Sequence, residues 1–253
     1  MKANPDDTRA PDSPFPHAAQ FVTTHWSVVV AAGGADSPAA HAALERLCRT
    51  YWFPLYAFIR RQGSSPEDAS DLTQGFFARA IEKEHFIKVD RSRGRFRAFL
   101  LACLKHYLAD ARDRERAAKR GGGKPLVSFD ALSAAERYQQ EPADTLSPDK
   151  LYDLQWARAL VEQARLKLRQ QYEAAGKGEL YAYLNRAEPG AAERLTYAEI
   201  GLRVNKTEVA VRNEASRLRQ RFHQLLRDEV AQTVASVPEI DEEIRYLCEL
   251  LGG

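Results

Sequence analysis

Cations and aromatic side chains alternate through one segment of this 253-residue chain, from Arg91 to Arg120. The segment carries ten Lys or Arg residues against three Asp or Glu residues. Phosphates suit such an excess, because each phosphate that a cation neutralises releases counterions. Phe96, Phe99, His106 and Tyr107 offer ring faces on which an unpaired base can stack. The segment predicts a nucleic-acid partner, and a solvated basic helix with ordinary core aromatics is the alternative.

The rest of the chain balances this local charge. The formal net charge is only +2, and acidic residues gather in stretches such as Asp228 to Glu243. With 28% charged and 44% hydrophobic residues, the composition is typical of a soluble globular protein. The N-terminal MKANPDDTRAPDSPFP lacks the apolar core of a signal peptide, and the apolar run Val28 to Ala32 is too short to span a bilayer. We therefore expect a cytoplasmic protein with no membrane partner.

The cysteines predict neither a disulfide framework nor a metal centre. Cys48, Cys103 and Cys248 are odd in number and widely separated. Cys103 and His106 have the spacing of half a zinc site, but no second Cys/His pair accompanies them. We expect Cys103 to be a small core residue, and we expect no metal and no cofactor.

Apolar residues recur at spacings of three and four through most of the chain, which predicts an all-α fold. Three consecutive glycines at 121–123 and later prolines predict a flexible linker between two helical domains, the second containing a helix-turn-helix. The predicted units are a disordered N-terminal arm, a first helical domain, the linker, a second helical domain and an acidic C-terminal extension, at residues 1–20, 21–120, 121–150, 151–230 and 231–253.

Ser65 and Asp68 predict the start of a helix in the first domain, with Ser65 as N-cap and Asp68 completing a capping box. This helix has two apolar stripes. One contains Phe76 and is the expected core face; the other contains Asp71, Gln74 and Phe77 and could meet a partner. The alternative is a helix buried on two sides within its own domain.

A second helix start, at Thr207, carries the predicted helix-turn-helix. Thr207 can cap a long helix, and Asn205 in the preceding turn suits a left-handed backbone. The other faces of the long helix are basic, as expected of a helix that enters a DNA groove. Many helical hairpins share this pattern, so it is weak when taken alone.

These segments, in this order, resemble sigma factors of the bacterial sigma-70 family, of the small extracytoplasmic-function type. Ser65-Pro66-Glu67-Asp68-Ala69 through Phe77 is similar to the family's polymerase-binding helix, and Phe99 to Arg112 is similar to the segment that melts the promoter and reads the minus-ten element. Tyr197 to Phe222 resembles the helix-turn-helix that reads the minus-thirty-five element. The first domain would then be region 2-like and the second region 4-like.

The resemblance implies three sets of binding residues and no catalysis. Contacts with core RNA polymerase, through its beta-prime and beta subunits, would involve Asp68, Asp71, Leu72, Gln74 and Phe77. The single-stranded minus-ten element would meet Arg95, Phe99, Lys105, His106, Asp110 and Arg112. The minus-thirty-five element would meet Arg203, Thr207, Arg212, Asn213, Ser216, Arg217 and Arg221.

Departures from the family pattern leave parts of this hypothesis open. Phe99 and His106 stand where the family often has Trp and Asn, and Glu214 would repel phosphate unless it pairs with Arg217, three residues on. A DNA-binding regulator that acts without polymerase is the first alternative. A nucleic-acid hydrolase is the second, although the chain has no metal-ligand spacing, phosphate loop or nucleophile motif. Control by an anti-sigma factor or a kinase is left open.

Overall fold

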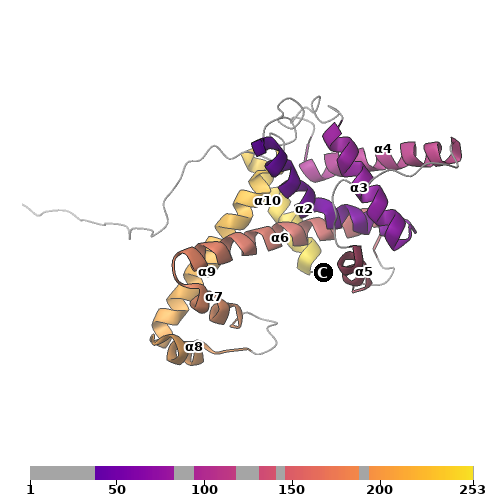
Figure 1. Ribbon diagram of the computed structural model, residues 1–253. Coiled ribbons are helices and arrows are strands. Elements are labelled where there is room, and N and C mark those ends of the chain that lie inside the picture. Colours follow the sequence, from indigo (N-terminus) through magenta and orange to yellow (C-terminus); the bar gives the residue numbers. More distant parts are fainter. Residues whose placement is uncertain (1–37, 83–93, 118–130, 141–145, 188–193, 253) are drawn as a thin grey trace, which may run out of the picture.

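The computed structural model describes residues 38–82, 94–117, 131–140, 146–187 and 194–252. Within these ranges the chain forms α-helices and no strand, which confirms the predicted all-α fold (Figure 1). The predicted N-terminal arm and the glycine triplet lie outside the described residues. The helices are α2 (Pro38–Arg61), α3 (Pro66–Glu82), α4 (Phe96–Ala117), α5 (Ala131–Gln139), α6 (Pro148–Ala174), α7 (Gly178–Asn185), α8 (Tyr197–Val204), α9 (Glu208–Ala231) and α10 (Val237–Gly252).

Helix α2 forms the centre of the first hydrophobic core. Its buried aromatic residues include Tyr51, Tyr56 and Phe58, which have no exposed surface. Pro54 lies inside the helix, where a proline commonly kinks or breaks the helix, and the helix continues through it. Proline removes one helical hydrogen bond, and burial of the aromatic residues on either side offsets that loss.

Helix α6 contributes to two cores, so the predicted domain boundary at residue 150 is not where the packing divides. Tyr152 and Trp156 in its first half belong to the first core, and Trp156 stacks on Tyr51 with ring centroids 3.8 Å apart. Leu168 and Tyr172 in its second half belong to the second core. The 3.6-residue period identified the apolar face of this helix correctly, but periodicity carries no information about which elements cover that face.

The predicted linker contains one of the helices. Helix α5 lies within residues 121–150 and packs against the first core through Ala134 and Tyr138. The guanidinium of Arg137 lies 3.9 Å from the ring centroid of Phe53, and that of Arg60 lies 5.0 Å from the ring centroid of Tyr138. Such cation–π contacts stabilise a short helix that would be marginal alone.

The acidic extension forms α10, which returns to the first core. Ile240 and Leu247 are buried there, together with Val230 and Val234 near the end of α9 (Figure 1). Helix α10 contacts both α6 and α9. The first core is therefore built from residues that are distant in the sequence, and the extension is part of it.

The second core lies between the second half of α6, the short helices α7 and α8, and α9. Its buried residues include Leu184, Ile200, Val211 and Leu218. Figure 1 shows α7 and α8 near one end of α6, and α3 and α4 near the other end. No helix in the described ranges is both long enough and apolar enough to cross a membrane.

The environments of the three cysteines predict their reactivity. Burial raises the pKa of the Cys48 thiol to about 12 and that of the Cys103 thiol to about 11, whereas Cys248 is exposed on α10. Because the thiolate is the reactive form, we expect a disulfide reagent at about pH 8 to titrate Cys248 rapidly and the other two slowly. Denaturant should release all three thiols. Rapid titration of Cys48 in the native protein would contradict the packing of α2.

Candidate polymerase and nucleic-acid interface

The start of α3 is fixed by its predicted cap. The backbone N–H of Asp68 donates to Ser65 Oγ at 3.0 Å, and Ser65 Oγ donates to Asp68 Oδ2 at 2.8 Å. Among the predicted polymerase-binding residues, Asp68 and Asp71 are exposed, whereas Leu72 and Gln74 are half-buried. Gln74 Nε2 donates to Ser70 Oγ at 3.2 Å. These four residues leave a polar surface with two exposed carboxylates on α3.

Phe77 is the exception, and our placement of it on an outward stripe is wrong. Its side chain is 5% exposed and packs in the first core beside Phe76, with ring centroids 5.4 Å apart. Helices α2, α4 and α5 all contact α3. For Phe77 the structure follows the alternative, burial within its own domain, whereas Asp71 of the same stripe is exposed.

The aromatic side chains of α4 are less accessible for stacking on a base than the sequence suggested. Phe96 has no exposed surface, so it offers no face to a base and that prediction is wrong. Phe99 is half-buried beside it, at 6.1 Å between centroids, and Tyr107 packs edge-on against Phe76 at 5.8 Å. His106 is exposed. The ring of His106 is therefore the most accessible of the four predicted stacking groups.

The polar candidates on α4 contact neighbouring elements. Lys105 Nζ donates to Asp149 Oδ1 at 2.5 Å, Asp110 pairs with Arg79 at 3.0 Å, and Arg112 Nη2 donates to Gln62 Oε1 at 2.7 Å. The side chains of Lys105, Asp110 and Arg112 remain exposed. Exposed pairs of this kind contribute little stability, so a phosphate can replace the present partner of Lys105 or Arg112 at small cost.

Arg95 and Arg97, at the start of α4, are bound more tightly. Arg95 Nε pairs with Glu243 at 3.0 Å, and Arg97 Nε pairs with Glu243 at 2.7 Å. Arg97 Nη1 also pairs with Asp153 at 2.6 Å, and its side chain is 11% exposed. Burial lowers the pKa of Arg97, but the hydrogen bonds and charges of Glu243 and Asp153 outweigh burial and raise that pKa above its ordinary value. The sequence analysis did not single out Glu243.

Residues 196–231 form two helices, α8 and α9, joined by a short turn. Thr196 and Glu199 form a full capping box at the start of α8, and hydrogen bonds from the backbone and side chain of Thr196 lower the pKa of Glu199. Asn205 ends α8 in the left-handed region, with φ 52°, as predicted. Thr207 caps α9 as predicted, accepting from the backbone N–H of Ala210 at 3.2 Å.

Glycine is required at position 201, inside α8, where the following turn approaches the helix. A Cβ added to Gly201 would lie 2.5 Å from the backbone oxygen of Lys206. The backbone N–H of Lys206 donates to the Gly201 oxygen at 2.9 Å, so α8 and the turn approach closely here. Neither the close backbone approach at Gly201 nor the cap at Thr196 was predicted from the sequence. A search for capping boxes would have found the cap at Thr196.

Most predicted DNA-binding residues of this unit are exposed on one side of its core. Val211, Ala215 and Leu218 are buried as expected. The exposed residues are Arg203, Thr207, Arg212, Asn213, Ser216 and Arg217. Arg212 pairs with Glu208 at 2.6 Å, and Glu214 pairs with Arg217 at 3.5 Å and with Lys177 at 3.7 Å.

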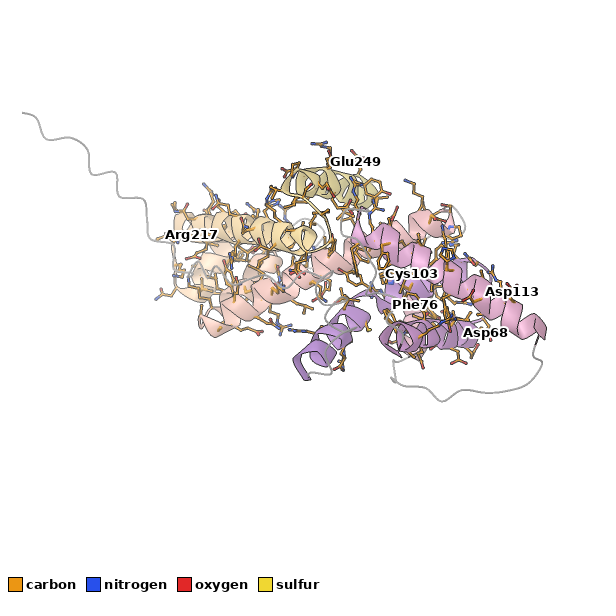
Figure 2. All side chains as sticks on the ribbon, turned by 90° about the horizontal axis from the view of Figure 1, so that it is seen from above. Asp68, Phe76, Cys103, Asp113, Arg217 and Glu249 are labelled. Atoms are coloured by element: carbon orange, nitrogen blue, oxygen red, sulfur yellow. The ribbon has the colours of Figure 1, made fainter. Side chains whose placement is uncertain are left out.

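Arg221 differs from this exposed set. It is half-buried, and its Nε donates to Gln171 Oε1 of α6 at 2.8 Å. Figure 2 shows Arg217 at one end of the molecule and Asp68 and Asp113 towards the other. The α3 and α4 surfaces and the exposed face of α9 are therefore two separate candidate sites. Within the described ranges, no three His, Cys, Asp or Glu residues are grouped to hold a metal ion.

Substitutions on α3 should separate core residues from surface residues. We expect Phe77→Ala to lower the free energy of unfolding by about 3–5 kcal/mol, because it leaves a cavity in the first core. Asp71→Ala should change it by less than about 0.5 kcal/mol, because the carboxylate is exposed. Urea denaturation followed by circular dichroism measures both. Equal midpoints for Phe77→Ala and the wild type would contradict the burial of Phe77.

The turn between α8 and α9 provides a second test. Gly201→Ala should cost about 1–3 kcal/mol, because the new Cβ must displace the backbone at Lys206. Asn205→Gly is the matched control, since glycine adopts the left-handed region without strain and should leave stability nearly unchanged. Urea denaturation compares the two variants. A Gly201→Ala variant as stable as Asn205→Gly would show that this turn is looser than described.

Comparison with known proteins gives one match. Residues 47–118, which span most of α2 and all of α3 and α4, match the family model described as Sigma-70 region 2. No curated protein and no solved structure matches the chain. The matched segment contains the capped helix α3 and the basic helix α4, the elements on which the resemblance rests. The match supports a role for the chain as a sigma factor of the sigma-70 family, in binding RNA polymerase and recognising promoters.

Proposed function

We propose that this protein is a sigma factor of the extracytoplasmic-function type, which binds core RNA polymerase and directs initiation by recognising and opening promoter DNA. The observation that carries the proposal is the region 2 match over α2 to α4, in a chain that also has two capped helices joined by a short turn at residues 196–231. The pair of capped helices is not sufficient alone, because helical hairpins are common. The region 2 match is not sufficient alone, because it covers less than half of the chain.

In this proposal α3 docks on the clamp helices of the polymerase beta-prime subunit. Asp68 and Asp71 supply exposed charge, and Leu72 and Gln74 supply a partly apolar surface beside them. Phe77 acts indirectly, since it is buried beneath this surface. Its role is to hold the backbone of α3 in place.

Helix α4 holds the separated strand, and α9 enters a major groove. Lys105 and Arg112 are exposed cations for phosphates, and the exposed ring of His106 can stack on a base. On α9, Arg212, Asn213 and Ser216 are exposed within the first three turns after the Thr207 cap, the end that meets base edges in helix-turn-helix proteins. Arg203, Arg217 and Arg221 would contact the backbone or flanking bases.

The decisive experiment is run-off transcription with core polymerase and genomic fragments. We expect discrete transcripts that require the protein, and Asp71→Ala should reduce both their yield and the capture of core polymerase. Glu162→Ala is the matched control, because it removes an exposed carboxylate from α6 instead. If the wild type binds DNA but captures no core polymerase, the result would favour a DNA-binding regulator that acts without polymerase.

Base reading by α9 gives a further prediction. Asn213→Ala or Arg212→Ala should lose about 1–3 kcal/mol at one position of the upstream element and little at others. Arg203→Ala should instead weaken all sequences alike and reduce the salt slope by about one, as loss of a phosphate contact does. Binding to a set of single-position duplex variants at several salt concentrations distinguishes the two patterns. Uniform weakening by all three substitutions would show that α9 reads no bases.

A further inference from the structure

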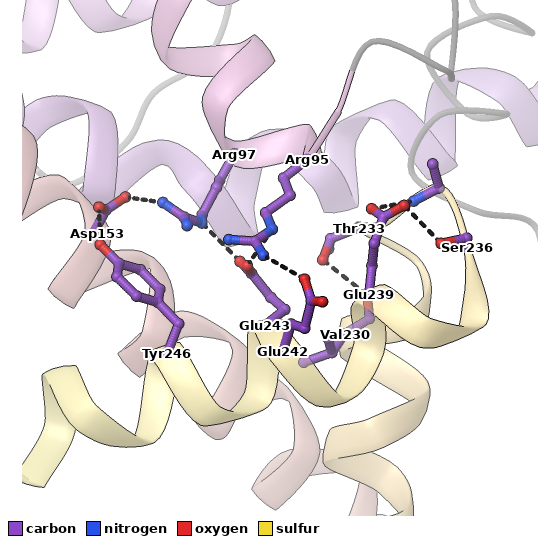
Figure 3. Close-up of polar contacts among 11 residues, drawn as sticks. Arg95, Arg97, Asp153, Val230, Thr233, Ser236, Glu239, Glu242, Glu243 and Tyr246 are labelled. Carbon is purple, nitrogen blue, oxygen red and sulfur yellow. Dashed lines mark hydrogen bonds and ion pairs between the residues drawn. The ribbon is translucent and has the colours of Figure 1, made fainter.

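Helix α10 covers the two arginines at the start of α4 with carboxylates (Figure 3). Glu243 is 1% exposed and lies between Arg95 and Arg97, at 3.0 Å and 2.7 Å from their Nε atoms. Glu242 lies 3.4 Å from Arg95 Nη2 at the exposed edge. Both arginines belong to the segment with ten cations and three anions, and Arg95 is among the residues expected to meet the single-stranded minus-ten element.

The contact extends through α6 and the end of α9. Asp153 accepts from Arg97 at 2.6 Å and from the hydroxyl of Tyr246 at 2.5 Å, and the Arg97 guanidinium lies 4.5 Å from the Tyr246 ring centroid. The backbone N–H of Phe96 donates to the oxygen of Thr233 at 2.8 Å. The start of α4 is thus held by α6, α9 and α10 together.

A carboxylate paired with an arginine occupies the donor groups that would otherwise bind a phosphate. We propose that α10 is an internal competitor of DNA: its carboxylates hold Arg95 and Arg97 in a closed form, and the strand binds them when α10 is displaced. This rests on the proposed function, since it assumes that the α4 segment binds nucleic acid. The ligand that competes is single-stranded DNA.

The separation of the two candidate sites is a second reason for opening. Helix α6, which joins the two cores, has 27 residues and is about 40 Å long at 1.5 Å per residue. Promoter elements centred about 25 base pairs apart lie about 85 Å apart along B-DNA, at about 3.4 Å per pair. At that length α6 covers about half of the separation, so binding to both elements at once would favour a form in which the two cores lie further apart.

The packing around the first half of α6 also contains a destabilising feature. Gln155 on α6 is fully buried, and neither atom of its side-chain amide has a hydrogen-bond partner among the described residues. A buried amide without partners destabilises the packing that buries it, because water satisfies the amide once that packing is lost. The interface at the first half of α6 is therefore less stable than its aromatic packing alone would make it.

The test compares two variants of the full chain on the same helix, each of which removes one negative charge. Glu243→Gln removes the carboxylate shared by Arg95 and Arg97, and Glu249→Gln removes an exposed carboxylate from the outer side of α10 (Figure 2). Fluorescence anisotropy with a labelled single-stranded oligonucleotide gives the affinity. We expect Glu243→Gln to bind about tenfold more tightly than the wild type, or about 1.4 kcal/mol, and Glu249→Gln to stay within about twofold. Equal affinities for the two variants overturn the proposal.

Hydrogen exchange shows whether α10 has been displaced. In Glu243→Gln the amide of Phe96, which bonds to Thr233, should exchange faster than in Glu249→Gln. If Glu243→Gln fails to fold, Glu242→Gln replaces it, because Glu242 is 62% exposed and contacts only the edge of the pair. That variant should show a smaller gain in affinity, and no gain would overturn the proposal.

The outcomes separate this inference from the proposed function. Faster exchange without tighter binding means that α10 is released but competes with no strand, and the inference fails. If transcription depends on the protein but both variants change it equally, the proposed function is supported and the proposed competition by α10 is not. If neither variant nor the wild type supports transcription, while Glu243→Gln binds the strand more tightly, the proposed function fails and the competition remains.

Discussion

The stacking of Trp156 on Tyr51 is the contact on which the rest of the arrangement depends. It fixes the first half of α6 against α2, with Tyr152 packed at its side, and the second half of the same helix then carries the second core. Because α6 is packed into a core at each end, it holds the two cores in a fixed position relative to each other. The surfaces of α3 and α4 are therefore held at a fixed orientation to the exposed face of α9 for as long as this stack persists.

Local signals in the sequence predicted local structure well. The caps at Ser65 and Thr207 and the left-handed Asn205 depend on residues within one turn, and each is where the sequence places it. The helices and their apolar faces could be predicted from the spacing of apolar residues, because that spacing is also a local signal. Helix α5 escaped notice because it is short and lies between glycine-rich and proline-rich stretches.

The partner of each face could not be predicted in the same way. Phe77 belongs to a stripe that looks suited to an external partner, and the packing of α2, α4 and α5 around α3 leaves it in the core. Trp156 likewise lies on a helix that periodicity assigns to the second unit. Arg97 looks like a phosphate-binding residue, yet its carboxylate partners are 56 and 146 residues away. Charge and hydropathy describe what a side chain can bind, and the fold decides which of those partners is present.

The long separation of Arg97 from Glu243 has a consequence for biosynthesis. At about 5–20 residues per second, a ribosome needs about 7–30 seconds to add the 146 residues between them. During that interval α2, α3 and α4 have emerged, while the carboxylate of Glu243 and the buried residues of α10 do not yet exist. The nascent chain therefore presents Arg95 and Arg97 without their carboxylate partners, beside messenger and ribosomal RNA, until translation of α10 completes the first core.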